Sequence, residues 1–144
     1  MKTRKATLAD SSDIARLTLQ LGYSADITEI KERLARILQR SDCAVYVAED
    51  DDSTLLGWIQ VHTLDVLESG LKVEIVGLIV AEKARRRGVG GILMQCAEAW
   101  TRKNGLEEIV VRSNSQRIES HLFYPAQGFH QTKTQTVYRK ILIL

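Results

Sequence analysis

The chain has 144 residues, which is enough for one domain with a hydrophobic core and too few for two. Its composition, 44% hydrophobic and 26% charged, is typical of globular proteins in water, and its net charge is only +2. A charge so close to zero provides no general attraction for nucleic acid or for an anionic membrane, so we expect neither as a partner.

The sequence shows no segment that would direct it into or across a membrane. No apolar run approaches the roughly 20 residues that a membrane helix needs. The amino terminus lacks the apolar segment of a signal peptide, and a cytoplasmic location is therefore expected. Cys43 and Cys96 lie far apart without metal-ligand spacing. We interpret both as small buried side chains in a reducing compartment and expect no metal site.

The amino-terminal part predicts a strand followed by two helices. Residues 2–7 form the strand, and Asp10 offers an N-cap for a helix that ends near Gly22. A second helix begins near Asp26, another N-cap residue, and carries apolar residues at helical spacing. Tyr23 lies in the link between the two helices.

Residues 43–49 and 54–62 predict a β-hairpin. The aspartates at 50–52 in its turn could hold a metal, but a solvated charge run is the preferred interpretation. Residues 63–70 are expected to form a loop before the next strand.

The most informative stretch lies between residues 73 and 91. Residues 73–80 are mostly Val, Ile and Leu, which predicts a strand covered on both faces. A basic turn with glycines at 85–91 opens an amphipathic helix that ends near Gly105. Strand, glycine turn and helix in this order present backbone N–H groups to a phosphate, so we predict a pyrophosphate site. The alternative is a tight turn with solvated arginines.

The carboxyl-terminal part predicts a strand, a helix and two closing strands. The strand covers residues 108–112, and the helix runs from about 117 to 127. Pro125 lies within this helix and should kink or shorten it. The closing strands are expected near 128–133 and 135–142.

These elements give the order β-α-α-β-β-β-α-β-α-β-β in one domain over residues 1–144. The predicted fold class is α+β, with a mixed arrangement of helices and strands. We expect a central, twisted and mostly antiparallel sheet of about seven strands, flanked by about four helices.

Two motifs resemble those of the GNAT acetyltransferases. Arg85-x-x-Gly88-x-Gly90, after an apolar strand and at the start of a helix, resembles the R/Q-x-x-G-x-G/A acetyl-CoA motif of this family. The segment from His121 to Tyr124, followed by Gly128-Phe129, resembles its late FY…GF segment. The order of elements is also similar, so the resemblance extends over nearly the whole chain.

The resemblance implies acetyl-CoA as co-substrate and assigns its binding residues. Backbone N–H groups of the glycine turn would hold the pyrophosphate, with arginine side chains at the rim. The backbone of the strand before it, which splays from its neighbour in the family, would bind the pantetheine. The residues expected to bind the cofactor are Leu78, Ile79, Val80, Arg85, Arg86, Arg87, Gly88, Val89, Gly90 and Gly91.

Tyr124 matches the tyrosine that protonates the departing thiolate in the family. A phenol within hydrogen-bond reach makes a thiolate a better leaving group. The alternative is a half-buried helix aromatic whose hydroxyl reaches water. The family's charged residues after this tyrosine are replaced here by Pro125-Ala126-Gln127, which could tilt Tyr124 or shorten its helix.

Glu74 is an ionisable residue inside an otherwise apolar strand, where a charge is costly unless it is paired, hydrated or used. Counted back from Arg85, it matches the general base of the histone-acetylating branch of the family. A carboxylate acting directly or through water could deprotonate an ammonium. The alternative is that Glu74 faces solvent or pairs near Lys72.

These expectations describe a GNAT-type acetyltransferase that moves an acetyl group directly to a primary amine. Because Lys133-Thr134 leaves little loop to close over a peptide, a small-molecule acceptor is expected. Tyr23 and Glu68 are candidate acceptor contacts, and a homodimer follows from family habit. The alternative function is a non-catalytic CoA-binding sensor or docking module. The acceptor itself stays open among small amines, aminoglycoside-like drugs, polyamines, amino acids and protein amino groups.

Overall fold

The computed structural model describes residues 1–20, 22–113 and 118–143, which belong to two compact units. The first unit is Met1–Arg112 and the second is Ser113–Leu144. The strands and the first three helices all lie in the first unit, and the last helix lies in the second.

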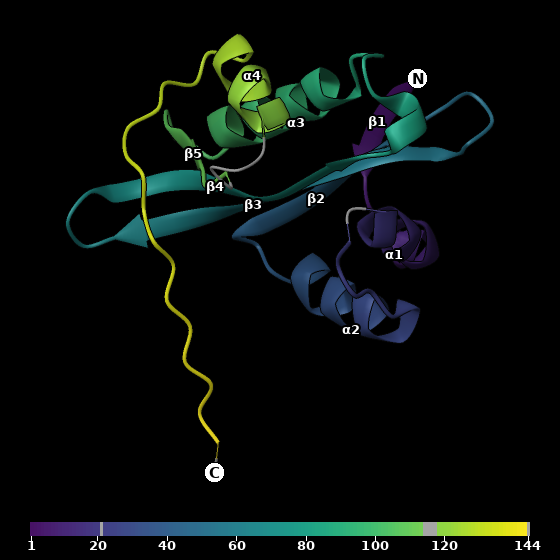
Figure 1. The fold of residues 1–144 in the computed structure, drawn as a ribbon, viewed down its shortest axis with the longest axis horizontal. Coiled ribbons are helices and arrows are strands. Elements are labelled where there is room, and N and C mark those ends of the chain that lie inside the picture. Colours follow the sequence, from purple (N-terminus) through teal and green to yellow (C-terminus); the bar gives the residue numbers. More distant parts are fainter. Residues whose placement is uncertain (21, 114–117, 144) are drawn as a thin grey trace. The chain divides into compact units, whose positions relative to one another are not determined.

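One five-stranded sheet forms the centre of the first unit (Figure 1). Its strands are β1 (Lys2–Lys5), β2 (Cys43–Glu49), β3 (Leu55–Val66), β4 (Gly70–Val80) and β5 (Ile109–Val111). They lie in the order β1-β2-β3-β4-β5. The first three pairings are antiparallel and only β4–β5 is parallel, which confirms the predicted, mostly antiparallel sheet.

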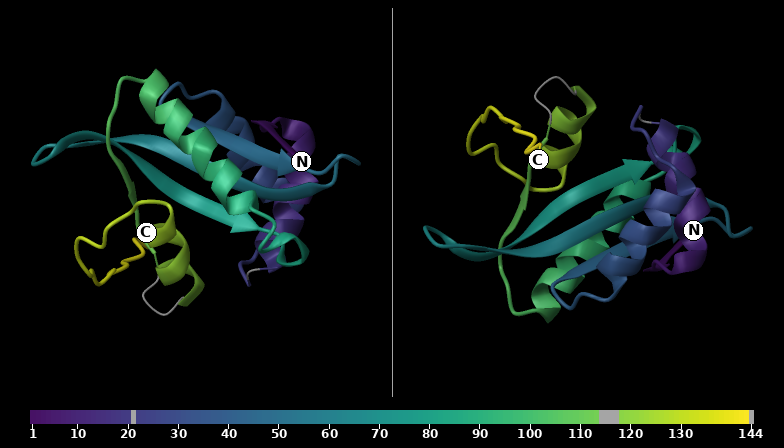
Figure 2. Two further views of the ribbon diagram at one scale, coloured as in Figure 1. Left: turned by 90° about the horizontal axis from the view of Figure 1, so that it is seen from above. Right: turned by 90° about the horizontal axis from the view of Figure 1, so that it is seen from below.

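Helices cover both faces of this sheet (Figures 1 and 2). α1 (Ser11–Gln20) and α2 (Ile27–Leu38) pack on one face, and α3 (Val89–Lys103) packs on the other. Short 3-10 helices, η1 (Leu8–Asp10) and η2 (Glu82–Ala84), precede α1 and α3. The largest fully buried side chains come from the helices and the sheet together: Leu17, Val47, Leu55, Ile59, Val61, Val73, Val89, Leu93 and Met94.

The second unit contains one helix, α4 (Ile118–Ala126), and no strand among its described residues. The predicted helix start at Arg117 lies outside the described residues. The two predicted closing strands are wrong, so the described sheet has five strands instead of about seven. A strand requires a ladder of hydrogen bonds to a neighbour, and residues 129–143 have none. These residues include several Thr, Val, Tyr and Ile side chains, which favour strands, but no neighbouring strand pairs with them among the described residues.

Asp10 does not cap the first long helix as predicted. The N-cap is Thr7, which precedes η1, and the Asp10 carboxylate accepts a hydrogen bond from the Thr7 N–H at 2.8 Å. The prediction for the second helix is confirmed, because the Asp26 side chain accepts from the Thr28 N–H. The error has a physical cause, since an acid at the third position of a capping box and an acid at the N-cap look alike in sequence.

The loop predicted at 63–70 is instead the end of a long hairpin. Pairing between β3 and β4 continues from Val61↔Ile75 to Val66↔Gly70. Thr63 and Leu64 continue the strand because β4 provides partners for their backbone groups. Glu68 consequently lies at the exposed tip of this hairpin.

Candidate functional site

The turn before α3 leaves the first amides of this helix without a capping side chain in the described part of the chain. Gly88 is the N-cap residue, in the left-handed region with φ of 81°, and no side chain caps the helix. The first turn of α3 holds no acidic residue. The first N–H groups of any helix lack intrahelical acceptors and lie at its positive end. The geometry therefore fits the anion site that the sequence predicted.

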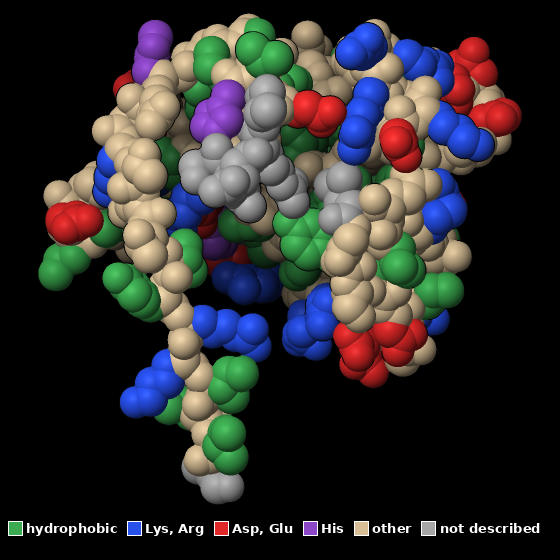
Figure 3. All heavy atoms as spheres, in the orientation of Figure 1, with side chains coloured by type: hydrophobic (Ala, Val, Ile, Leu, Met, Phe, Trp, Pro, Cys, Tyr) green, Lys and Arg blue, Asp and Glu red, His purple; other side chains and the backbone are tan. Residues whose placement is uncertain are grey.

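The three arginines of this turn are exposed side chains. Arg86 adopts a positive φ of 68°, which is uncommon for a residue with a Cβ. Arg87 forms an exposed ion pair with Asp50 in the β2–β3 turn, with 3.4 Å between nitrogen and oxygen. Figure 3 shows basic and acidic side chains intermixed near this end of the sheet. Asp51 of the same turn pairs with the amino-terminal ammonium at 3.1 Å, so two of the three aspartates neutralise nearby positive charges.

The strand leading to this turn has an open edge. β5 pairs with β4 only at Val73, Glu74 and Ile75. From Val76 to Val80, no strand of the described chain pairs with this edge of β4. The edge of β4 that contains Leu78, Ile79 and Val80 is therefore open in the described chain, while the other side of these residues pairs with β3.

A β-bulge lies where this open edge begins. Gln60 pairs with Gly77 while Val61 pairs with Ile75, so Val76 has no partner in the register. A bulge of this kind bends a strand and re-aims its backbone groups. The distance along the strand from Val76 to Val80 is about 13 Å, at about 3.3 Å per residue.

Trp58 packs over the residue that follows the bulge. A Cβ on Gly77 would lie 2.7 Å and 2.8 Å from two carbons of the Trp58 ring, so only glycine fits. The Nε1 of Trp58 is buried and has no hydrogen-bond partner in the described part of the chain. The Trp58 ring therefore packs directly against the backbone of Gly77, next to the bulge.

Glu74 is buried and has a partner on each carboxylate oxygen. Its Oε1 lies 2.9 Å from Nε2 of His62, and its Oε2 lies 2.9 Å from Nη1 of Arg112. The side chain of Glu74 is 8% exposed, that of His62 is 29% and that of Arg112 is 68%. The alternative in which Glu74 faces solvent is thereby excluded. Lys72 donates to the Ser69 hydroxyl at 2.8 Å and lies 4.0 Å from the Glu108 carboxylate.

His62 and Glu74 lie on the face of the sheet covered by α1 and α2. The Cys43 thiol donates to the carbonyl of Ile37 at the end of α2 and therefore faces that helix. Cys43 pairs with His62, and His62 pairs with Glu74. Directly opposed residues of neighbouring strands point to the same face. Sequence reasoning missed this cluster, because its members come from three strands whose register is not visible in the sequence.

Of the two predicted acceptor contacts, Tyr23 lies on the same side of the sheet as this cluster and Glu68 lies apart from it. Tyr23 lies in the link between α1 and α2, in the layer that covers the same face of the sheet, and it is exposed. Glu68 lies at the tip of the β3–β4 hairpin, beyond Gly70. Glu74 lies four positions after Gly70, which corresponds to about 13 Å along a strand. The structure therefore separates Glu68 from Glu74.

Tyr124 lies in α4 of the second unit, and the FY…GF motif forms the end of that helix. The Phe129 N–H donates to the Tyr124 carbonyl and the Gly128 N–H donates to the Pro125 carbonyl. Gly128 has a φ of 91°, and the rings of Tyr124 and Phe129 meet edge to face at 5.6 Å. This is a Schellman motif with its apolar contact. Pro125 is accommodated because α4 ends one residue later.

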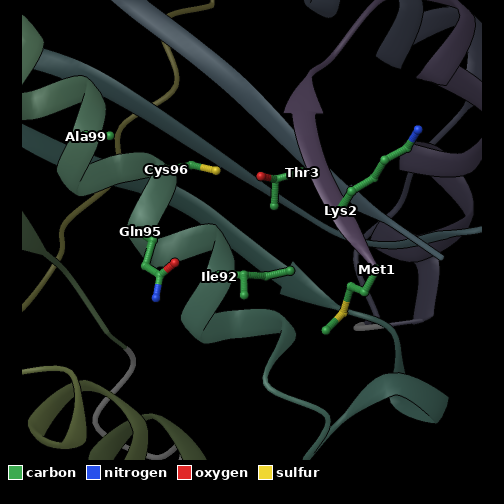
Figure 4. Close-up of a pocket in the computed structure, with 7 residues that line it drawn as sticks. All are labelled: Met1, Lys2, Thr3, Ile92, Gln95, Cys96 and Ala99. Atoms are coloured by element: carbon green, nitrogen blue, oxygen red, sulfur yellow. The ribbon is translucent and has the colours of Figure 1, made fainter. Parts of the chain in front are cut away.

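A hollow of about 310 Å³ elsewhere in the first unit contains none of the predicted site residues (Figure 4). It lies between β1 and α3 and is lined by Met1, Lys2, Thr3, Ile92, Gln95, Cys96 and Ala99. Within the described ranges, no group of three or more His, Cys, Asp or Glu residues could hold a metal ion. None of the described helices is both long and apolar enough to cross a membrane.

Known proteins resemble the chain over both units. The sequence model of the acetyltransferase (GNAT) family matches residues 13–129. An aminoglycoside N(6')-acetyltransferase type 1 from Stenotrophomonas maltophilia is 29% identical over 140 residues, covering 94% of this chain and 90% of that protein.

Solved structures show the same fold. The aminoglycoside 6'-N-acetyltransferase AAC(6')-IG from Acinetobacter haemolyticus superposes with a TM-score of 0.85 at 19% identity, covering 99% of both chains. AAC(6')-Iy, solved with the bisubstrate analogue CoA-S-monomethyl-acetylneamine, superposes with a TM-score of 0.85 at 21% identity, covering 98% of both chains.

Proposed function

The chain belongs to the GNAT family of acetyltransferases, and we propose that it transfers the acetyl group of acetyl-CoA to a primary amine of an aminoglycoside-like small molecule. The observation that carries this proposal is the open edge of β4, which leads through η2 into the uncapped amino terminus of α3. A long ligand with a diphosphate at one end can place its arm along the open strand edge and its diphosphate at the helix amino terminus.

In this proposal the diphosphate of acetyl-CoA occupies the amino terminus of α3. The backbone N–H groups from Arg86 to Gly91 bind it, and the arginine side chains at the rim contribute positive charge. The pantetheine arm lies along Leu78, Ile79 and Val80, which pair with β3 on one side and with no strand of the described chain on the other. Its reactive end then lies toward the bulge at Val76, two residues from Glu74.

The proposed reaction is direct attack by the acceptor amine on the thioester carbonyl. Direct transfer depends on holding the reactants close and on moving protons. We assign proton removal from the amine to Glu74 together with the side chains that contact its carboxylate. We assign protonation of the leaving thiolate to Tyr124. The resemblance of the FY…GF segment supports the role of Tyr124.

The relatives support an aminoglycoside-like acceptor. The Stenotrophomonas protein is named for acetylation of the 6'-amine of aminoglycosides, and its similarity covers 94% of this chain. The exposed ring of Tyr23 would form one wall of the acceptor site. Glu68 would attract a cationic acceptor from the hairpin tip.

CoA release in a panel of amines tests this proposal. We expect turnover with an aminoglycoside that has a 6'-amine and no turnover with the matched analogue that has a 6'-hydroxyl. CoA release with a different class of amine would contradict the proposed acceptor and still support the acetyltransferase activity. Thermal stabilisation by acetyl-CoA without release in any reaction would favour the non-catalytic CoA-binding module, because stabilisation follows ligand occupancy alone.

The remaining expectations stay predictions from the sequence. These are the cytoplasmic location, the homodimer, the single domain over residues 1–144, and the exclusion of nucleic acid and membrane as partners. Both cysteines of the described chain are free thiols, as a reducing compartment would allow.

A further inference from the structure

We propose that His62 is the group that takes the proton from the acceptor amine, and that Glu74 is its positioning residue. The inference rests on the proposed function, and it names a residue that the sequence alone did not favour as the base. The observation behind it is the buried chain of contacts from Arg112 through Glu74 to His62.

Glu74 is poorly placed to meet a substrate itself. Each of its oxygens already has a nitrogen partner at 2.9 Å, and its side chain is 8% exposed. A substrate ammonium would have to displace Arg112 or His62 before it could reach the carboxylate. His62, at 29% exposed, is the member of the His62–Glu74 pair that solvent and a ligand can reach.

The contacts of Glu74 also determine which nitrogen of His62 can accept a proton. A carboxylate paired with an arginine can only accept hydrogen bonds, so Nε2 of His62 must be the donor toward Oε1. The neutral ring then has its lone pair on Nδ1. Within the described chain, no hydrogen-bond partner of Nδ1 is present.

The location fits an acceptor-side role. His62 and Glu74 lie on the face covered by α1 and α2, where Tyr23 occupies the link between these helices. Glu74 lies two residues before Val76, in the middle of β4, beside the point where the reactive end of acetyl-CoA is proposed to lie. The carbon that is attacked and the group that takes the proton would therefore meet at one end of the open edge.

The proposed step conserves protons and electron pairs. An N–H proton of the acceptor ammonium moves to Nδ1 of His62, and Glu74 stabilises the resulting imidazolium. The neutral amine forms a bond to the thioester carbonyl carbon, and the bond between that carbon and sulfur breaks. The thiolate takes a proton from Tyr124, which regains one from the new amide nitrogen. His62 then returns its proton to water, so one proton is released per turnover.

The charged and titratable groups near His62 come from every element packed against it. Cys43 lies opposite on β2, Glu74 lies opposite on β4, and Arg112 follows β5. The Asp42 carbonyl accepts from the Thr63 N–H, so the exposed Arg40–Asp42 ion pair is also close. Burial raises the pKa of the Cys43 thiol, which keeps it neutral beside the histidine.

Steady-state kinetics with the 6'-amino aminoglycoside test this step. His62→Gln retains a donor for Glu74 but cannot take the amine proton, and we expect kcat to fall about a hundredfold. The fall in kcat on the acidic side of the pH profile should disappear, and acetyl-CoA affinity should stay within twofold. For an acceptor whose amine is already neutral at the assay pH, the loss should shrink below tenfold. His130→Gln, an exposed histidine of the second unit, is the matched control.

The outcomes distinguish this inference from the proposed function. If the wild-type protein acetylates no amine, both fail. If it does, a kcat of His62→Gln within threefold of wild type overturns the role of His62. The same conclusion follows if the acidic limb of the pH profile of kcat is unchanged in His62→Gln and absent in Glu74→Gln. Should the variant not fold, ¹⁵N NMR of the histidines in the wild-type protein decides. Protonation of Nε2 in the neutral His62 ring supports the inference, and protonation of Nδ1 overturns it.

Discussion

At the scale of single residues, Tyr124 is positioned by the hydrogen bond to its backbone carbonyl and by the packing of its ring. The Schellman motif fixes its carbonyl, and its ring packs edge to face against Phe123 and Phe129. Removing the hydroxyl should therefore leave the ring in place. The FY…GF pattern therefore has two explanations. Gly128 and Phe129 end the helix, and Tyr124 is the proposed proton donor.

Tyr124→Phe should lower kcat without changing acetyl-CoA affinity. The leaving thiolate loses its proton donor, and loss of one general acid costs about 10²-fold or more. Ring contacts are retained, so the free energy of unfolding should change by less than about 1 kcal/mol. Turnover and a thermal shift with acetyl-CoA measure the two effects. Tyr138→Phe, on an exposed tyrosine, is the control, and a Tyr124→Phe enzyme with wild-type kcat would exclude the acid role.

At the scale of elements, the amino terminus of α3 joins the sheet to the proposed donor site. Gly88 allows the chain to turn with φ of 81° and leaves open space where a Cβ would be. The first amides of the helix then face outward without a capping side chain. The backbone geometry of one residue therefore controls which groups are available to an anion.

Gly88→Ala should weaken acetyl-CoA binding and destabilise the fold slightly. A Cβ at positive φ costs about 1 kcal/mol through contacts with its own backbone, and relief of that strain would rotate the first amides. Gly105→Ala is a close control, because Gly105 follows the other end of α3, has φ of 72° and also has open space around it.

Calorimetric titration with acetyl-CoA and thermal unfolding separate these two effects. Both variants should lose a similar amount of stability, and only Gly88→Ala should lose affinity. Equal acetyl-CoA affinities in the two variants would remove the glycine turn from the donor site.

At the scale of the whole molecule, the sequence predicted what depends on local periodicity. The apolar run at residues 73–80 and the glycine turn after it identified β4 and the start of α3, and N-cap chemistry located α2 at Asp26. The order of elements through α4 is as predicted. These features depend on residues close together in the chain, so a single sequence is sufficient to predict them.

Features that depend on distant partners were not predictable from one sequence. The length of the β3–β4 hairpin depends on register, and the His62–Glu74–Arg112 cluster depends on three strands meeting in one alignment. The predicted closing strands were wrong because strand formation also depends on a distant partner, and these residues have none in the described chain. A segment with strand-forming residues such as Val137, Tyr138 and Ile141 forms a strand only where a neighbour is available to pair with it.

A buried charge network links the amino terminus to the sheet and should make the stability of the first unit dependent on pH. Arg4 binds both oxygens of Asp10 at 2.8 and 2.9 Å and contacts Glu49 at 3.3 Å. Asp10 and Glu49 are buried, while the Arg4 side chain is 36% exposed. The hydrogen bonds from Arg4 lower the pKa of Asp10 below its ordinary value of 3.8.

The sign of the pH effect follows from this lowered pKa. Above the ordinary value, the Asp10 carboxylate is ionised in both folded and unfolded chains, and its interactions with Arg4 stabilise the fold in full. As the pH falls from that value through the lower pKa of the folded state, the unfolded chain binds the proton first, and this stabilisation is lost.

Asp10→Asn should therefore destabilise the protein by about 2 kcal/mol near neutral pH, a value reduced for the partial exposure of Arg4. The difference from wild type should persist down to about pH 4 and shrink below it, which urea unfolding at a series of pH values would measure. Asp13→Asn, whose exposed carboxylate lies 3.5 Å from Arg16, should change stability by less than about 0.5 kcal/mol. A difference that grew as the pH fell would contradict the assigned role of the Asp10 charge, because protonation of Asp10 makes the wild type resemble the variant.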